Sequence, residues 1–397
     1  MIEIRKVEPG EMHEYVRAQG MAFGVHRDAE IVDELVGLVG GQHCVAAFED
    51  GRVVGTTMDF DAGLTLPGGA SAAMVALTWV GVLPTHRRQG AMRGLIEAQL
   101  ATARERGVPL AGLWASEVAI YGRFGFGPAT SHYDAVEVER RHGAFARPLE
   151  DGGRVRLIAS EEAAAVLPVV HERARLLRAG DVSRPDSEWQ FLTAIKRLAE
   201  TFLVVHEDAA GTADGYALYK IERHWTAAVA QNTVQCEELM WATPEAHAAL
   251  WRFLLDIDLV AKVRVATRPL DEPVRWLLAD PRRASFGPVL DGMWLALLDE
   301  PAALSARSYA ADGSLALEVD GRVLRLEAVG GESSCEPSSD APELAVSSQA
   351  LAAAYLGGHR FAELAQGGLV EERADGALRR ADRMFQAERV AWCSSLF

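Results

Sequence analysis

The stretch from Val80 to Arg93 joins an apolar run to a cluster of arginines around one glycine. It reads Val-Gly-Val-Leu-Pro-Thr-His-Arg-Arg-Gln-Gly-Ala-Met-Arg. The apolar run, the Pro-Thr break and the helical spacing that follows predict a strand, a tight turn and a helix start. Backbone N–H groups at a helix start lack intrahelical partners and lie at the positive end of the helix dipole. The stretch therefore predicts a binding site for a pyrophosphate or a similar anion.

The side chains of this stretch suit such a site. Gly90 and Ala91 allow the backbone to approach a phosphate, whereas a bulkier side chain would fill that space. Arg87, Arg88 and Arg93 add positive charge. The alternative is an arginine cluster on a solvated helix start, but the preceding strand and the apolar helix favour the anion site.

A second segment with chemical potential, Tyr-Gly-Arg-Phe-Gly-Phe, begins at Tyr121. A phenol has a reference pKa of about 10, so it can protonate a departing thiolate of similar basicity. The alternative is a packed aromatic turn. We favour the acid role for Tyr121 and the packing role for Phe124 and Phe126.

Three successive sets of elements would position these segments. The first contains strands at 2–7, 44–49, 52–61, 73–83 and 108–115 and helices at 11–21, 28–38 and 87–106. Thr85 is expected to cap the last of these helices. The strand–helix–strand order predicts neighbouring strands in one sheet.

The second set repeats this order and predicts a divergent internal copy. Its strands are expected at 154–158, 202–206, 215–221, 233–242 and 262–267, and its helices at 161–178, 187–200 and 244–259. The segment 240–249, which aligns with the binding turn, has no arginine and no glycine. Glu245 brings negative charge there, so we expect one active site per chain.

The third region begins near residue 299 and is expected to be a small α+β domain. It contains a hairpin at 314–326 and a loop rich in glycine, serine and proline at 330–342. Helical patterns follow at 347–356 and 378–385. The region has few aromatic residues to line a lipid tunnel, so we expect a structural role.

The strand–turn–helix stretch resembles the acetyl-CoA motif of the GNAT family, Q/R-x-x-G-x-G/A. Arg87 and Gly90 match it, and the last position is Met92, or Ala91 in a shortened version, which departs from the commonest form. In that fold the strand before the turn splays from its neighbour, and its amides hold the pantetheine arm and the acetyl carbonyl. The resemblance assigns the coenzyme to Val80, Gly81, Val82, Arg87, Arg88, Gln89, Gly90, Ala91, Met92, Arg93, Ser116 and Glu117.

The Tyr121 segment resembles the fourth GNAT motif, whose tyrosine sits near the coenzyme sulfur. Together with the Pro-Thr-His-Arg-Arg turn, segment 120–130 is similar to the Eis (enhanced intracellular survival) family. The resemblance covers all 397 residues. It implies a mixed α/β (α+β) fold with tandem GNAT-like domains, the second degenerate, and a sterol-carrier-like domain. The expected domains are 1–148, 149–297 and 298–397.

The Eis resemblance also implies a role for the C-terminal carboxylate, which in that family enters the first domain's site as general base. This sequence ends Trp-Cys-Ser-Ser-Leu-Phe, so the role falls to Phe397. The alternative is that Phe397 only anchors the last strand. Because a reference α-carboxyl pKa is about 3.5 and that of an alkyl ammonium about 10.4, we expect proton transfer through water as attack proceeds.

The family resemblance implies acetyl transfer from acetyl-CoA to a primary amine by direct attack, with aminoglycosides, polyamines or lysine side chains as acceptors. It also implies a homo-oligomer, a hexamer. Alternatives are a narrow protein Nε-lysine acetyltransferase and a non-catalytic acyl-CoA sensor or lipid carrier. A sensor needs neither Tyr121 nor the Phe397 carboxylate, so those residues favour an enzyme.

Composition limits the classes of partner that the protein can bind. The net charge of −16 argues against nucleic acid or an anionic membrane and favours a cationic partner. No apolar stretch of 18 residues and no signal peptide are evident, so a cytoplasmic protein is expected. The four cysteines lie far apart and the histidines show no H-x-x-x-H spacing, so no metal site is expected.

Overall fold

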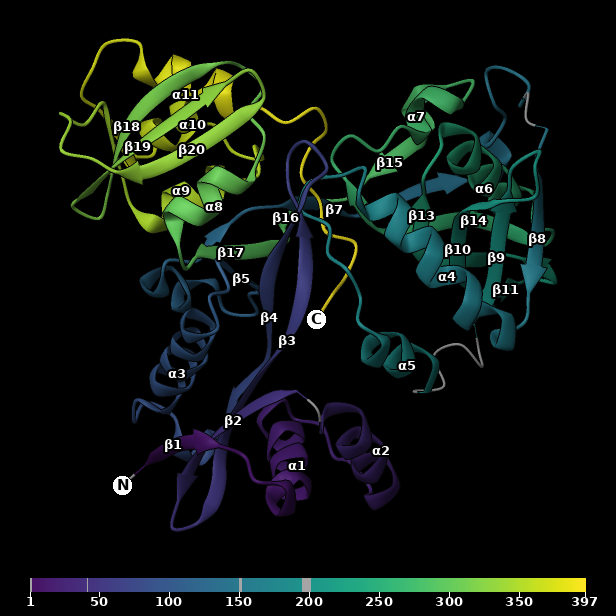
Figure 1. Ribbon diagram of the computed structural model, residues 1–397. Helices are drawn as coiled ribbons and strands as arrows, with labels where there is room; N and C mark the ends of the chain where they lie inside the picture. Colours follow the sequence, from purple (N-terminus) through teal and green to yellow (C-terminus); the bar gives the residue numbers. More distant parts are fainter. Residues whose placement is uncertain (1, 41, 150–151, 195–200) are drawn as a thin grey trace. The chain divides into compact units, whose positions relative to one another are not determined.

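The computed structural model describes residues 2–40, 42–149, 152–194 and 201–397 (Figure 1). The chain forms two compact units, each built from separate segments. Unit 1 comprises Met1–Ala129, Met293–Gln386 and Leu396–Phe397, and unit 2 comprises Thr130–Gly292 and Ala387–Ser395.

The first sheet of unit 1 has seven strands in the order β1-β2-β3-β4-β5-β17-β6. The strands are β1 (Glu3–Lys6), β2 (His43–Glu49), β3 (Arg52–Thr65), β4 (Ser71–Val82), β5 (Leu110–Trp114), β6 (Gly127–Pro128) and β17 (Met293–Leu297). The helices are α1 (Met12–Ala22), α2 (Ala29–Val39) and α3 (Ala91–Glu105). Each predicted strand and helix of this set is present, within a few residues at its ends, which is the usual uncertainty of an element boundary.

Helix α3 starts later than predicted, and the expectation that Thr85 caps it is wrong. Pro84–His86 form a 3₁₀ turn, the Thr85 hydroxyl contacts the His86 ring at 2.7 Å, and the N-cap is Gly90. Arg88 and Gly90 have φ of +61° and +87°. Two left-handed residues cannot continue a right-handed helix, so α3 begins only at Ala91.

One face of α3 packs on the sheet. Its buried side chains Leu95, Ile96, Leu100 and Ala103 recur at helical spacing. Ile96 and Leu100 share a core with Val75 and Leu77 of β4 and Leu113 of β5. This core packs α3 against β4 and β5.

Unit 2 contains an eight-stranded sheet that follows the path β15-β7-β14-β13-β10-β9-β8, with β16 paired to β7. Its strands are β7 (Ser131–Glu139), β8 (Arg154–Ile158), β9 (Phe202–Glu207), β10 (Ala213–Glu222), β13 (Asn232–Trp241), β14 (Val260–Pro269), β15 (Ala284–Phe286) and β16 (Val289–Asp291). A small hairpin pairs β11 (Trp225–Thr226) with β12 (Val229–Ala230). The helices are α4 (Ser160–Arg175), α5 (Asp186–Ala194), α6 (Pro244–Asp256) and α7 (Val274–Leu277). Part of the helix predicted at 187–200 lies outside the described residues.

The order β10–β13–α6–β14 repeats β3–β4–α3–β5, as the predicted internal copy requires. In both units the two central strands pair in parallel and the strand before them is antiparallel. One strand in each sheet falls in the range predicted for the other domain: β17 lies within 149–297 and β7 lies within 1–148. β17 pairs with β5 and β6, and β7 pairs with β14. The units therefore divide at 129/130 and 292/293, whereas the expected domain ends were 148 and 297.

The remainder of unit 1 is a five-stranded sheet in the order β20-β19-β18-β21-β22 with four helices. Its elements are α8 (Glu300–Ala306), β18 (Gly313–Val319), β19 (Arg322–Val329), β20 (Glu332–Pro337), β21 (Leu344–Val346), α9 (Ser348–Ala354), α10 (Phe361–Gln366), β22 (Val370–Glu372) and α11 (Ala377–Phe385). The prediction of a loop at 330–342 is wrong in part, because β20 occupies residues 332–337. β20 pairs with β19 and buries Cys335. Its strand conformation is therefore set by pairing and burial, although its composition is typical of a loop.

A buried arginine packs in the interior of this last domain. Arg307 is buried, its guanidinium lies 4.6 Å from the Phe385 ring centroid, and it donates to the carbonyls of Tyr355 and Phe385. The structural role of this domain stays a prediction. Among the described residues, none of the helices has the length and apolar character that crossing a membrane would need.

Candidate active site

The end of β4 separates from β5. The two strands pair in parallel only from Met74 to Leu77, opposite Leu110 to Leu113. β4 continues to Val82, whereas β5 ends at Trp114. The edge of residues 78–82 that faces away from β3 therefore has no strand partner in the described part of the chain and is available to a polar ligand. This is the splayed strand that the sequence comparison with the GNAT family implied.

A bulge bends β4 at the same place. Thr56 pairs with Gly81 and Met58 with Thr78, so Trp79 and Val80 lie opposite the single residue between Thr56 and Met58. Trp79 has φ of +57°, and the Thr56 hydroxyl donates to its carbonyl at 2.9 Å. Bulges of this kind redirect backbone groups beside active sites.

A cavity of about 370 Å³ lies at the N-terminus of α3. Seven of the residues assigned to the coenzyme line it: Val82, Arg87, Arg88, Gly90, Ala91, Met92 and Arg93. The other lining residues are His86, Ile120, Arg123 and Phe124. The first turn of α3 has no acidic residue, and its N-cap Gly90 has no side chain to cap it. Its first N–H groups therefore remain for an anion.

Gly90 is suited to this position for two reasons. Its φ of +87° is unfavourable for any residue with a Cβ, and a Cβ placed there would meet no atom within 4 Å. The space above the helix start is therefore open. The arginines around it, Arg87, Arg88, Arg93 and Arg123, have no ion-pair partner among the described residues and are exposed.

The other five predicted coenzyme residues do not line the cavity. Val80 is half-buried against the core under α3. Gln89 is exposed, and Ser116 and Glu117 are exposed in the loop after β5. Gly81 is buried where α1 ends, because a Cβ there would lie 2.9 Å from Ala22 and 3.0 Å from Phe23. Gly81 therefore serves close packing of the chain against β4.

Arg123 is the residue that sequence reasoning missed. It lines the cavity beside Phe124, and its side chain is exposed to the open space. The signal was present, since Arg123 stands between Tyr121 and Phe124 in the aromatic segment.

Tyr121 lies between two cavity residues, Ile120 and Arg123, where two 3₁₀ turns meet. It is 4% exposed, and its ring packs edge-on against Phe126 with centroids 6.1 Å apart. Burial, and then the charge of Glu117, raise the pKa of Tyr121 above its ordinary value. The phenol is therefore held in its protonated form, as a proton donor must be.

Phe397 lies beside the point where β4 leaves β5. Its ring meets Phe60 edge-on with centroids 5.8 Å apart. Phe60 pairs with Ala76, one residue before the last β4 residue that pairs with β5. Because neighbouring strand residues point to opposite faces and Asp59 contacts Arg106 after α3, Phe397 lies on the other face of β3.

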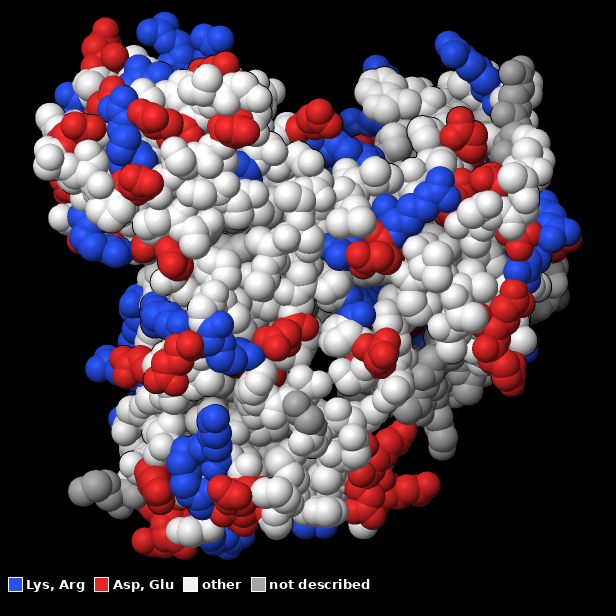
Figure 2. Space-filling view, viewed as in Figure 1, with Lys and Arg blue, Asp and Glu red and all other residues white. Residues whose placement is uncertain are grey.

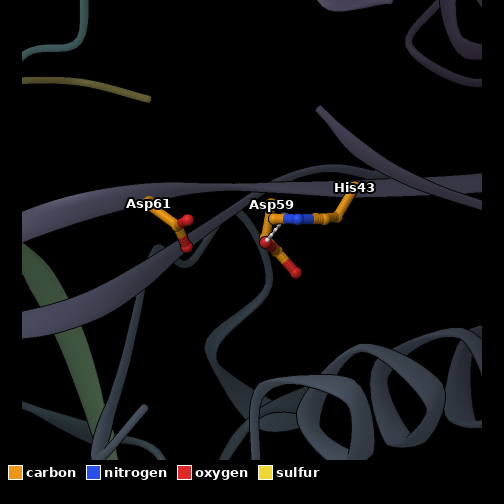
Figure 3. Close-up of side chains that lie close together, drawn as sticks. All are labelled: His43, Asp59 and Asp61. Atoms are coloured by element: carbon orange, nitrogen blue, oxygen red, sulfur yellow. Dashed lines mark hydrogen bonds and ion pairs between the residues drawn. The ribbon is translucent and has the colours of Figure 1, made fainter. Parts of the chain in front are cut away.

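One group of side chains among the described residues has the spacing of metal ligands: His43, Asp59 and Asp61 (Figure 3). His43 Nδ1 lies 2.8 Å from Asp59 Oδ1. The Arg106 guanidinium donates to Asp59 at 3.0 Å and to Asp61 at 2.8 Å. An arginine thus supplies the positive charge that a metal ion would bring, and it ties the end of α3 to β3.

Comparison with family models divides the chain into three parts. An acetyltransferase (GNAT) domain matches residues 3–129 and a second one matches residues 180–295. A sterol carrier protein domain matches residues 301–394. This is the tandem arrangement with a third domain that the sequence predicted, in a mixed α/β fold.

Relatives match along most or all of the chain. An uncharacterized N-acetyltransferase of Streptomyces griseus is 35% identical over 420 residues, which cover 100% of both chains. The N-acetyltransferase Eis of Mycobacterium tuberculosis is 35% identical over 85% of this chain and 84% of its own length. The crystal structure of Eis1 from Mycobacterium abscessus superimposes with a TM-score of 0.88 and 31% identity over 100% of both chains.

Proposed function

The chain belongs to the Eis family of GNAT N-acetyltransferases and is an acyltransferase, and from this premise we propose that it moves the acetyl group of acetyl-CoA to a primary amine. One observation carries the proposal: the open space above Gly90, ringed by four arginines, at the end of a splayed strand. That geometry suits a pyrophosphate with a thioester arm extended along β4.

The proposed chemistry is direct attack. The amine nitrogen forms a bond to the acetyl carbon while the carbon–sulfur bond breaks, and the unpaired edge of β4 stabilises the carbonyl oxygen. Tyr121 gives its proton to the departing thiolate. The amine passes a proton through water to the carboxylate of Phe397. The products are the N-acetyl amine and coenzyme A.

We propose cationic acceptors, namely aminoglycosides, polyamines or lysine side chains. The connection from α1 to α2 packs against Gly81 of β4, and α2 then presents a dense set of carboxylates to solvent. They form the red patch over α2 at the lower right of Figure 2 and comprise Asp28, Glu30, Asp33 and Glu34. Together with the net charge of −16, this patch would attract a polycation.

Coenzyme A thiol release with acetyl-CoA and a panel of aminoglycosides and polyamines tests the proposal, with wild type compared with Tyr121→Phe. We expect turnover with at least one amine and a sharp fall in kcat for the variant. Tyr133→Phe, a half-buried tyrosine in unit 2, is the matched control and should keep wild-type kcat. Unchanged turnover in Tyr121→Phe would remove Tyr121 as the acid.

The same assay separates the alternatives. Tight acetyl-CoA binding without turnover on any small amine would favour a protein Nε-lysine acetyltransferase of narrow range, or a sensor. We also propose a homo-oligomer, a hexamer by family resemblance, without nucleic-acid or membrane partners. Light scattering coupled to size exclusion measures that assembly directly.

A further inference from the structure

The segment before the last two residues is bound by unit 2 although it has no regular secondary structure. Ala387–Ser395 belong to unit 2, whereas Leu396 and Phe397 belong to unit 1. The backbone of this segment is held at two points. The Trp392 N–H donates to the Ala179 carbonyl at 3.0 Å, and Arg178 donates to the Val390 carbonyl at 2.8 Å.

Gly180 and Trp392 anchor the segment. Gly180 has φ of +93°, and a Cβ there would lie 3.2 Å from both the nitrogen and the oxygen of Trp392. Only glycine therefore lets the two stretches approach so closely. The Trp392 ring is 4% exposed and packs in the core of α4, β9 and β10.

Asp181 and Arg184 form hydrogen bonds with the two serines that follow Cys393. Asp181 Oδ1 accepts both the backbone N–H of Ser394, at 3.0 Å, and its hydroxyl, at 2.9 Å. Arg184 Nε donates to the Ser395 hydroxyl at 2.8 Å. Asp181 is 1% exposed, and its Oδ1 also accepts from the Val182 N–H at 3.0 Å, so these hydrogen bonds replace those that the carboxyl group would make to water.

Arg184 is itself fixed from the other side. Its guanidinium lies 3.0 Å from Glu238 Oε1 and 3.7 Å from Glu188 Oε1. The Tyr216 hydroxyl donates to Glu238 at 2.5 Å. Side chains of α5, β10 and β13 thus fix Arg184, which in turn binds Ser395.

We propose that Asp181 and Arg184 are positioning residues for acetyl transfer: they latch Ser394 and Ser395 and so determine where the carboxylate of Phe397 can reach. The proposal rests on the proposed role of that carboxylate. Two residues extend at most about 7 Å, so a latched Ser395 leaves the terminus little freedom. A proton acceptor held in place needs no ordering when substrate binds.

Asp181→Ala in the full chain removes both hydrogen bonds to Ser394. We expect kcat to fall about tenfold or more, with the KM for acetyl-CoA unchanged, because the coenzyme cavity is made by unit 1 alone. Asp181→Asn keeps an acceptor oxygen and should restore most of the activity. If Asp181→Ala destabilises the fold, Ser394→Ala with Ser395→Ala weakens the latch from the tail side and should act in the same way.

Asp214→Ala is the matched control. Asp214 is also buried in unit 2, where it accepts from Thr243 and lies 2.6 Å from His206, but it does not touch the tail. Asp214→Ala should lower the melting temperature, but it should not lower kcat per folded enzyme as Asp181→Ala does. An equal loss of kcat in Asp214→Ala would overturn the latch.

A chain extended by two glycines after Phe397 separates the latch from the carboxylate's role. We expect the extension to lower kcat and Asp181→Ala to add little to it, because both act through the terminus. An undiminished effect of Asp181→Ala in the extended chain would overturn the latch. An extension that leaves kcat unchanged would instead remove the carboxylate as proton acceptor, and the latch as its positioning device with it.

Discussion

The two GNAT-like copies in this chain share a splayed central strand but differ at the helix that follows it. In unit 1, β4 continues past its last pair with β5, and in unit 2, β13 continues past its last pair with β14 at Cys236. A bulge adds one residue to each splayed strand. The connection to the helix is eight residues in unit 1, 83–90, and only two in unit 2, 242–243.

The helix starts also differ in charge and capping. Gly90 leaves the first turn of α3 uncapped, and no acid lies there. Thr243 caps α6 by accepting from the Ala246 N–H, and Glu245 stands in the first turn. The anion-binding groups of α6 are thus already satisfied or opposed.

In unit 2 a buried arginine lies beside the end of β13 that extends past its last pair with β14. Arg268 is 1% exposed, donates to the Leu239 carbonyl at 3.0 Å and lies 4.9 Å from the Trp241 ring centroid. Glu272 pairs with it at 3.0 Å. Both copies have the splayed strand, but only unit 1 combines it with an open connection and exposed arginines at the helix start, and we therefore place the proposed coenzyme site there alone.

The largest effect on stability should come from breaking the buried Arg268–Glu272 ion pair beside β13. Glu272→Gln leaves Arg268 buried without its counter-charge, and loss of one partner of a buried pair costs about 3–5 kcal/mol. We expect a large fall in melting temperature and an unchanged KM for acetyl-CoA per folded enzyme. A coenzyme site in unit 2 would instead raise that KM.

Glu272→Gln should also change the acid stability. Burial would raise the pKa of Glu272, but the charges and hydrogen bonds of His247 and Arg268 outweigh it and lower that pKa to about 2. A lowered pKa adds stability above the unfolded value of about 4.5, and this is lost as pH falls towards 2. Denaturation curves between pH 5 and pH 2 should therefore show a smaller loss of unfolding free energy in Glu272→Gln than in wild type.

Gly90→Val should abolish coenzyme binding at the site proposed in unit 1. The side chain would occupy the open space above α3 and force a β-branched residue to a positive φ. We expect the KM for acetyl-CoA to rise about 30-fold or more, roughly 2 kcal/mol of lost binding. Gly107→Val is the matched control, since Gly107 at the other end of α3 also has a positive φ and open space around it. Equal rises in KM for both variants would contradict the assignment.

Arg123→Ala tests the residue that only the structure placed in the cavity. Loss of one charged contact to a phosphate should weaken acetyl-CoA binding about five- to tenfold, less so at high salt. Calorimetry at two ionic strengths measures this, and Arg17→Ala, an exposed arginine of α1, is the control. A salt-independent loss would show that Arg123 acts through packing instead.

The smallest effect concerns a carboxyl group beside the latch. Burial, opposed by Arg184 and reinforced by the charges of Glu238 and Asp181, raises the pKa of Glu188 to about 7. A raised pKa contributes stability below pH 4.5 that is lost as pH rises through about 7. Glu188→Gln should therefore melt a few degrees higher than wild type at pH 8 and no higher at pH 4. An identical pH profile for the two proteins would refute the assignment.

Local pattern alone predicted much of the fold and part of the site. The strand at 73–83, the arginine turn and the helix after it depend on neighbouring residues, and the structure has all three close to their predicted places. The helix start was misjudged because positive φ at Arg88 and Gly90 has no compositional signal apart from the glycine itself. Cavity residues Arg123 and Phe124 come from a loop about 30 positions further along the chain, so their place beside α3 could not be read from spacing.

The sequence by itself determined that the chain carries two copies of one motif and that only the first has the arginines and the glycine for an anion. Tertiary structure alone decided which strands complete each sheet and how the chain end is held. β17 joins β5, and Asp181 binds Ser394, 213 positions away. Periodicity reports which face of an element is buried but not which distant element covers it, because hydrogen-bond partners so far apart are selected only when the whole chain packs.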